Sequence, residues 1–128
     1  MKVIAFDVNE VCEYCLKDDT EKSDTFSLGI LDTYQWNYVR SLLVKENYSL
    51  AAISLVVMGL KGWIGLKDKH DYVIPFGNEI TDIPGVGKTE VVSKKCLDAI
   101  RPYIDELSVE LVKINQMSES DSKNSVTP

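Results

Sequence analysis

The stretch Leu50–Phe76, LAAISLVVMGLKGWIGLKDKHDYVIPF, decides the fold of this chain. It opens with an almost unbroken apolar run, Leu50–Leu60, which carries almost no polar face. Other elements must cover such a helix on most of its sides. Crossing a bilayer takes about 18 to 20 apolar residues, so this shorter run predicts a buried helix and not a membrane span.

The second half of the stretch predicts a turn, a charged hinge and an apolar segment that runs back. Gly59 and Gly62 predict a turn around Trp63, and residues 67–71 (KDKHD) form a charged hinge. Residues 72–76 (YVIPF) then predict an apolar, strand-like arm.

Three aromatic residues flank this turn: Trp63, Tyr72 and Phe76. Aromatic side chains are enriched at interface hot spots, so one interpretation is a partner-binding patch. The other is structural: Trp63 plugs the end of the buried helix and the arm pairs with another strand. The sequence leaves both open.

Composition excludes some classes of protein. The 128 residues predict one domain, large enough for a real core. A net charge of -6 disfavours binding to nucleic acid, which needs clustered Lys and Arg, and favours solubility and a basic partner. The N-terminus lacks the pattern of a signal peptide, and three cysteines, an odd number, indicate reduced thiols in a cytoplasm.

Upstream, the pattern predicts short strands and a short helix. We expect a strand over 2–8 and a helix over 10–16 capped by Asn9. A polar loop follows over 17–24, and residues 25–31 (TFSLGIL) alternate as a half-buried strand.

A second helix is expected over Tyr34–Val44, just before the buried one. Asp32 or Thr33 is its predicted cap, and Trp36 begins an apolar stripe at helical spacing. The short break at 46–47 predicts that the two helices lie antiparallel.

Downstream, residues 77–88 (GNEITDIPGVGK) are rich in turn formers and predict a surface loop. A short helix is expected over 89–100, and Pro102 then fits the first turn of another. Apolar residues along that last helix repeat at steps of three and four. This stripe either completes the core or seals a self-association surface. Its members are Ile104, Leu107, Leu111 and Ile114.

The predicted class is α+β, with short N-terminal β-strands packed on a mainly helical body of four to five helices. We expect one globular domain over residues 1–117. The polar tail 118–128 (SESDSKNSVTP) has a single aliphatic residue and is expected to be disordered.

Residues 85–89 (GVGKT) end in the Gly-Lys-Thr of a phosphate-binding loop. That motif also needs a glycine five residues before Gly87, where this chain has Asp82. A carboxylate there would repel a phosphate, so we favour a Pro-Gly turn leading into a helix capped by Thr89. An enzymatic function would need Lys88 and Thr89 to bind nucleotide.

Cys12 and Cys15 have the spacing of a zinc clamp or a redox pair, and only Cys96 and His70 remain to complete a set of four ligands. The acidic neighbourhood raises the pKa of a thiol and lowers its reactivity. We therefore favour cysteines that pack as small hydrophobes, and a solvated surface position for His70, the single histidine. No catalytic residue, metal or cofactor is predicted.

One block resembles a family. Residues 59–63 (GLKGW), a charged hinge, and Pro75-Phe76 resemble a segment common in small proteins of tailed phages and prophages. An amphipathic helix and a polar tail with Lys-Asn-Ser, here residues 123–125, follow in those proteins. Residues 13–19 before 25–28 are similar to their entry segment. This chain departs from the pattern at Asp71, where glycine is usual, and at Cys15, where an aliphatic residue is expected.

The resemblance implies a non-enzymatic protein of virion morphogenesis, similar to tail assembly chaperones. Its partners would be other phage structural proteins, namely the tape-measure protein or tail components, and it would form homo-oligomers. We expect no binding to nucleic acid or membrane, and a location in the bacterial host cytoplasm or on the virion. The alternative is a small acidic inhibitor or immunity-type protein that blocks a basic host or nuclease target. The candidate partner-binding residues are Trp63, Tyr72, Phe76, Leu107 and Leu111.

Overall fold

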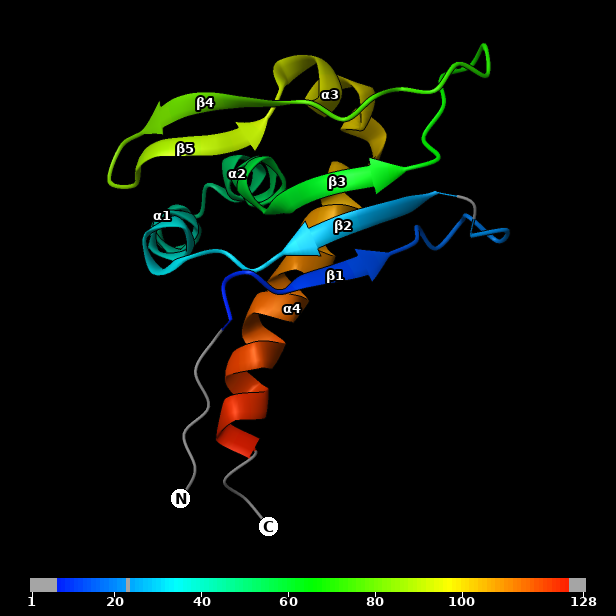
Figure 1. Ribbon diagram of the computed structural model, residues 1–128. Coiled ribbons are helices and arrows are strands. Elements are labelled where there is room, and N and C mark those ends of the chain that lie inside the picture. The colour runs from blue at the N-terminus through cyan, green and yellow to red at the C-terminus, as the bar shows by residue number, and fades with distance from the viewer. Residues whose placement is uncertain (1–6, 23, 125–128) are drawn as a thin grey trace.

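The computed structural model describes residues 7–22 and 24–124, with side chains as far as Gln116. In that part of the chain, a three-stranded antiparallel sheet, ordered β1-β2-β3, and a β4–β5 hairpin combine with four α-helices (Figure 1). The elements are β1 (Val11–Tyr14), β2 (Thr25–Gly29), α1 (Thr33–Val44), α2 (Tyr48–Gly59), β3 (Leu60–Ile64), β4 (Asn78–Ile83), β5 (Gly87–Val92), α3 (Lys94–Ala99), a 3-10 turn (Arg101–Tyr103) and α4 (Ile104–Asn124).

The apolar run forms α2, and α2 lies at the centre of the molecule (Figure 1). It packs against α1, α4, β3 and β5, so the expectation that other elements cover it is confirmed. Leu55, Val56 and Met58 are almost fully buried. Within the described residues, no helix is long and apolar enough to cross a membrane.

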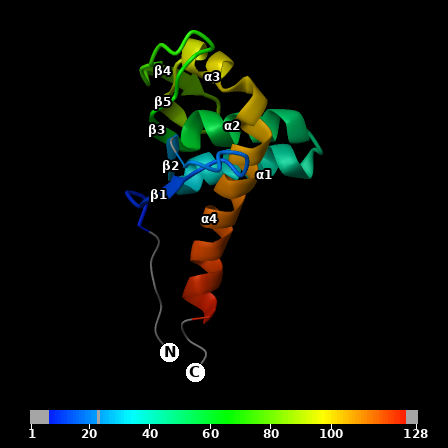
Figure 2. The ribbon, with the colours of Figure 1, turned by 90° about the vertical axis from the view of Figure 1, so that its right-hand side faces the viewer.

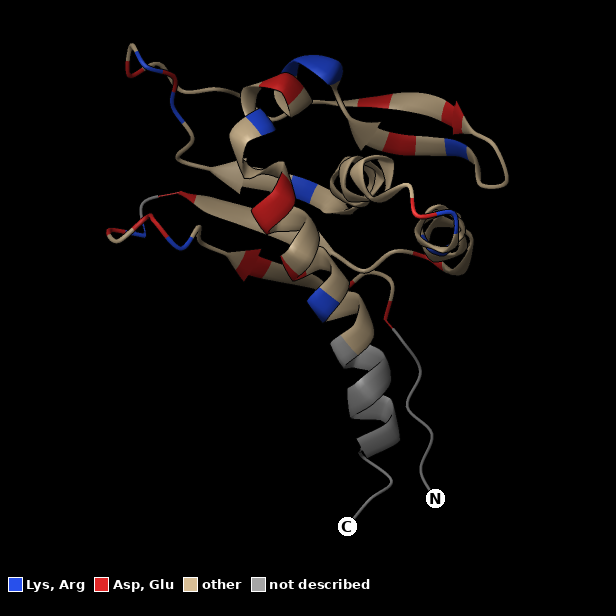
Figure 3. Ribbon diagram, turned by 180° about the vertical axis from the view of Figure 1, so that it is seen from behind, with Lys and Arg blue, Asp and Glu red and all other residues tan. Residues whose placement is uncertain are grey.

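One face of the three-stranded sheet belongs to the core. Tyr14 pairs with Phe26, and Phe26 pairs with Trp63, so these side chains point to the same side. α4 crosses this side of the sheet (Figures 1 and 3). Leu107 and Leu111 of α4 are fully buried, so the amphipathic stripe completes the core. The alternative, a self-association surface built on these two residues, is wrong for this fold.

α1 begins where the sequence predicts it. The Asp32 carboxylate accepts a hydrogen bond from the backbone N–H of Gln35, and the Gln35 side chain accepts one from the backbone N–H of Asp32. This reciprocal capping box fixes the first turn. A short link around Glu46, whose φ is 59°, turns the chain into α2, and the two helices lie side by side (Figures 1 and 2).

The structure differs from the predictions for the N-terminal segment. Residues 1–6 of the expected strand 2–8 lie outside the described residues, and residues 7 and 8 are not in a strand. The predicted helix over 10–16 is wrong, because Val11–Tyr14 form β1. Cys12 and Tyr14 alternate toward the core, and pairing with β2 overrides the local helical pattern.

The structure also differs from the predicted turn after α2. Gly59 ends the helix, and the chain runs directly into β3. The predicted arm over 72–76 is not a strand, since only an isolated bridge joins Val73 to Lys67.

The predicted loop over 77–88 is wrong, because residues 78–83 and 87–92 form the β4–β5 hairpin. Its turn uses Gly85 and Gly87, whose φ angles are 81° and 99°. Thr89 and Val91 point inward at the two-residue period of a strand, so the predicted helix is reduced to α3.

The fold class α+β is confirmed, but the strands extend along the chain to Val92 and are not confined to its N-terminal part. Pro102 lies in the 3-10 turn that leads into α4, as predicted. α4 continues to Asn124, whereas the tail from residue 118 was expected to be disordered; residues 125–128 lie outside the described part.

Candidate functional site

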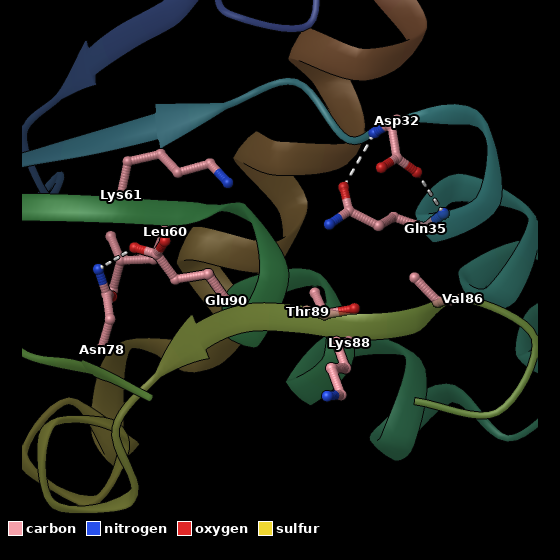
Figure 4. A pocket seen from close by; sticks show the side chains of 9 residues that line it. All are labelled: Asp32, Gln35, Leu60, Lys61, Asn78, Val86, Lys88, Thr89 and Glu90. Carbon is pink, nitrogen blue, oxygen red and sulfur yellow. Dashed lines mark hydrogen bonds between the residues drawn. The ribbon is translucent and has the colours of Figure 1, made fainter. Parts of the chain in front are cut away.

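A polar pocket opens between the start of β3, the β4–β5 hairpin and the first turn of α1 (Figure 4). Its volume is about 400 Å³. Charged side chains of both signs line it. They are Lys61, Lys88, Asp32 and Glu90, with the amides of Gln35 and Asn78 and the hydroxyl of Thr89 between them.

Lys61 is the cation that the fold positions most closely. A register shift in the β2–β3 ladder leaves it as an extra residue between Leu60 and Gly62. Its ammonium donates a hydrogen bond of 2.9 Å to the carbonyl of Met58, in the last turn of α2. Its stem lies over Gly29, where an added Cβ would come within 2.7 Å of Lys61 Cε.

Partial burial lowers the pKa of the Lys61 ammonium, and the negative charges of Glu90 and Asp32 oppose this shift. Lys61 is therefore positioned by contacts with α2 and β2, in the field of two carboxylates.

The two carboxylates are fixed by amide groups. Asn78 donates a hydrogen bond of 2.6 Å to Oε1 of Glu90, across the β4–β5 hairpin. Oδ1 of Asp32 accepts the N–H of Gln35 at 2.9 Å in the capping box. Because Oε1 of Gln35 is the acceptor in that box, its NH₂ group is left to face the pocket, as Figure 4 shows.

The Gly-Lys-Thr sequence lies on this pocket without forming a phosphate-binding loop. Gly87, Lys88 and Thr89 belong to β5, and no helix begins at Thr89. The Thr89 hydroxyl is buried and donates to the carbonyl of Gly87 at 2.9 Å. The Lys88 side chain extends on the other side of β5 from Asp32 and Gln35 (Figure 4). The predicted helix cap at Thr89 is wrong too, since Ser93 caps α3.

The four residues considered for zinc do not come together. Cys12 lies on the core side of β1, and burial, followed by the charges of Glu10, Glu110 and Glu13, raises the pKa of its thiol. Cys15 lies beside Thr25. Cys96 is buried, and its thiol donates to the carbonyl of Pro75, while His70 is exposed in the hinge. Among the described residues, no group of three such side chains could hold a metal ion.

The three aromatic residues divide between the two interpretations. Trp63 is 9 % exposed, and its indole N–H donates to the carbonyl of Ile74 at 2.7 Å. Its ring packs edge to face on the rings of Phe76 and Phe26, with distances between ring centroids of 5.0 Å and 6.2 Å. Trp63 and Phe76 therefore tie the returning arm to the core. Tyr72 is 71 % exposed and makes no part of this cluster.

Two further exposed apolar residues, which the sequence did not single out, lie on the same segment of chain as Tyr72. Ile64 ends β3, Val73 follows Tyr72, and both are more than half exposed. We call Ile64, Tyr72 and Val73 the hinge patch. Oδ1 of Asp68 accepts the backbone N–H groups of His70 at 2.8 Å and Tyr72 at 3.1 Å, which fixes the shape of the loop that leads to Tyr72.

The pocket residues were also missed, apart from Lys88 and Thr89 and from Asp32 as a cap. Gln35 could have been found as the third residue after Asp32, the spacing of a capping box. Nothing in the sequence brings Lys61 and Glu90 together. Comparison with protein-family models, with curated proteins and with solved structures finds no match.

Proposed function

We propose that this chain is a non-enzymatic protein of a phage or prophage that acts by protein–protein contact in virion morphogenesis, similar to a tail assembly chaperone. Its partner would be the tape-measure protein or a tail component. The particular role is supported by the resemblance of the GLKGW and Pro75-Phe76 block to small phage proteins.

The hinge patch carries the protein-contact part of this proposal. Ile64, Tyr72 and Val73 are 70, 71 and 66 % exposed, although each is a large apolar side chain. Tyrosine is enriched at interface hot spots, and exposed apolar side chains gain free energy when a partner removes them from water. The patch is therefore suited to docking on another protein.

The block that resembles the phage proteins is also the block that supports this patch. Trp63, from GLKGW, packs edge to face on Phe76, from the Pro-Phe pair. The hinge between them is closed by the hydrogen bond from Asp68 N–H to the carbonyl of Tyr72, at 2.9 Å. The sequence block and the exposed apolar residues thus form one local unit.

Co-purification tests the proposal. The chain is co-expressed with the tape-measure protein of the proposed phage or prophage, and capture of the complex is expected. Changing Tyr72 and Val73 together to serine should remove capture while leaving the thermal transition unchanged, because both side chains are solvated. Tyr34→Ser, on α1 and 66 % exposed, is the matched control and should bind normally. Capture that survives the double substitution would refute the docking role of the patch.

The alternative function, an acidic inhibitor of a basic host or nuclease target, rests on the net charge of -6. Inhibitors of this kind bind through a concentrated acidic surface. Acidic residues are instead spread over strands, loops and helices and alternate with basic ones (Figure 3). Retention of a basic nuclease, with no retention of tail proteins, would favour the alternative.

A further inference from the structure

We propose that the polar pocket between β3, β5 and α1 binds a small zwitterion of the amino-acid class, a molecule that carries one ammonium and one carboxylate. This inference goes beyond the proposed function and does not depend on it, because the pocket does not include the hinge patch.

The donor side of the pocket fits a carboxylate. The Lys61 ammonium uses one of its three N–H bonds on the Met58 carbonyl, which leaves two. The Gln35 amide uses only its oxygen in the capping box, which leaves both N–H bonds of its NH₂ group. In Figure 4 the Lys61 ammonium and the Gln35 amide nitrogen both point into the space between their elements. A carboxylate placed between them would accept from a cation and from a neutral donor.

The acceptor side fits an ammonium. Glu90 receives the Asn78 amide on Oε1, and Asp32 receives the Gln35 N–H on Oδ1. Within the described part of the chain, no protein donor is recorded at the second oxygen of either carboxylate. Asp32 and Glu90 lie at opposite ends of the pocket (Figure 4), so an ammonium group bound at either carboxylate would gain a charge-assisted hydrogen bond, which is about twice as strong as a neutral one.

The arrangement of donors and acceptors favours a zwitterion over a simple ion. Lys61, Asp32 and Glu90 line the same space, whereas the Lys88 side chain extends on the other side of β5 (Figure 4). A lone anion would be attracted by Lys61 and repelled by both carboxylates, and a lone cation would be attracted by both carboxylates but would leave the remaining N–H groups of Lys61 and Gln35 without an acceptor. A ligand that carries both charges avoids these opposed interactions. The volume of about 400 Å³ leaves room for a small side chain as well.

The side chains that would contact the ligand are held before binding. Gly29 makes room for the stem of Lys61, Asn78 orients Glu90, and the capping box orients Asp32 and Gln35. Preorganised polar groups lose less conformational entropy on binding than mobile ones.

Titration of the full chain with a panel of free L-amino acids, followed by NMR chemical shifts, tests this proposal. At least one member should shift pocket resonances at millimolar concentration and saturate. The matched half-ligands, which for alanine are propionate and ethylamine, should bind about tenfold more weakly, because each loses one charge-assisted contact. The proposal is overturned when no amino acid binds, or when either half-ligand binds as well as the zwitterion.

Three variants locate the binding. Gln35→Glu keeps the oxygen acceptor of the capping box and removes the amide donors, so the chain should fold normally and bind the amino acid about tenfold more weakly. Glu90→Gln and Lys61→Met should weaken binding by a similar factor. Lys95→Met, on the exposed surface of α3, is the control and should leave the dissociation constant unchanged. Unchanged binding in the first three variants would place the ligand elsewhere and refute the site. This outcome is independent of the capture experiment on Tyr72 and Val73.

Discussion

Replacing Gly59 with alanine probes the close approach of α2 and α4. A Cβ at this position would lie 2.5 Å from Cδ2 of Leu111 and 3.3 Å from Cδ1 of Leu31. Leu111 is fully buried, so it has little free space into which its methyl groups could move. The substitution therefore forces a neighbour out of its preferred rotamer or moves one helix.

The expected magnitude follows from two opposed effects. Alanine is favoured over glycine inside a helix by up to about 1 kcal/mol, and by less at the last residue, where Gly59 lies. Overpacking a core with one extra methyl group costs about 1–3 kcal/mol. The second effect is larger, so we expect Gly59→Ala to lower the free energy of unfolding by about 1–2 kcal/mol.

Urea unfolding followed by circular dichroism measures this change, with an unchanged m-value as the sign of a two-state comparison. Leu111→Ala alone should cost about 2–5 kcal/mol. In that background the clash is gone, so Gly59→Ala should become neutral or stabilising by about 0.5–1 kcal/mol. If Gly59→Ala stabilises the natural chain, as helix propensity alone predicts, then α2 and α4 do not approach each other this closely.

Four further predictions concern α4, its contact with β1, and the start of α1. Leu107→Glu buries a charge at a fully buried position, so the cooperative thermal transition should be lost; a folded monomer by light scattering would contradict its place in the core. Glu106 accepts a hydrogen bond of 2.5 Å from the Tyr14 hydroxyl, which lowers the pKa of its carboxyl group. Its stabilising contribution is therefore complete above about pH 4.3 and is lost as the pH falls through the lower pKa of the folded state. The urea midpoints of the natural chain and Glu106→Gln should accordingly differ at neutral pH and converge in acid. Burial, together with the bond to Glu106, raises the pKa of Tyr14, so stability should also fall above about pH 10, and Tyr14→Phe should remove that alkaline loss. Asp32→Ala removes the cap of α1 and should cost about 1 kcal/mol, whereas Asp32→Asn, which keeps the acceptor, should cost less in the same urea titration.

Elements with a strong local signal could be predicted from the sequence. The apolar run gave α2, the alternation of Phe26 and Leu28 gave β2, and Asp32 gave the start of α1. Each signal acts within a few residues: a cap binds its own first turn, and burial of one face follows the period of the element. Pro102 acts in the same local way before α4.

Elements that need a distant partner could not be predicted. Val11–Tyr14 has both helical and extended possibilities, and only the ladder with β2 makes it a strand. β3 also depends on pairing with β2. The β4–β5 hairpin lies in a segment whose many turn residues predict a loop. Strand pairing joins residues far apart in sequence, so the local pattern carries little information about it.

The candidate site shows the same division. The sequence marked Asp32 as a cap and Lys88 as part of a motif, but Lys61 carried no signal and Glu90 was placed in a helix. They meet only because β3, β5 and α1 surround one space. Likewise, exposure separates Tyr72 from Trp63, although both are aromatic residues of one block.

By itself the sequence determined a buried central helix, its capped neighbour, a net negative charge and an amphipathic last helix, because these follow from composition and short-range periodicity. The tertiary structure alone decided that Leu107 and Leu111 belong to the core, that the Gly-Lys-Thr sequence lies in a strand, and that charges of both signs gather around one pocket. Burial and charge environment are properties of the packed chain, since they depend on which distant segments exclude water from each side chain.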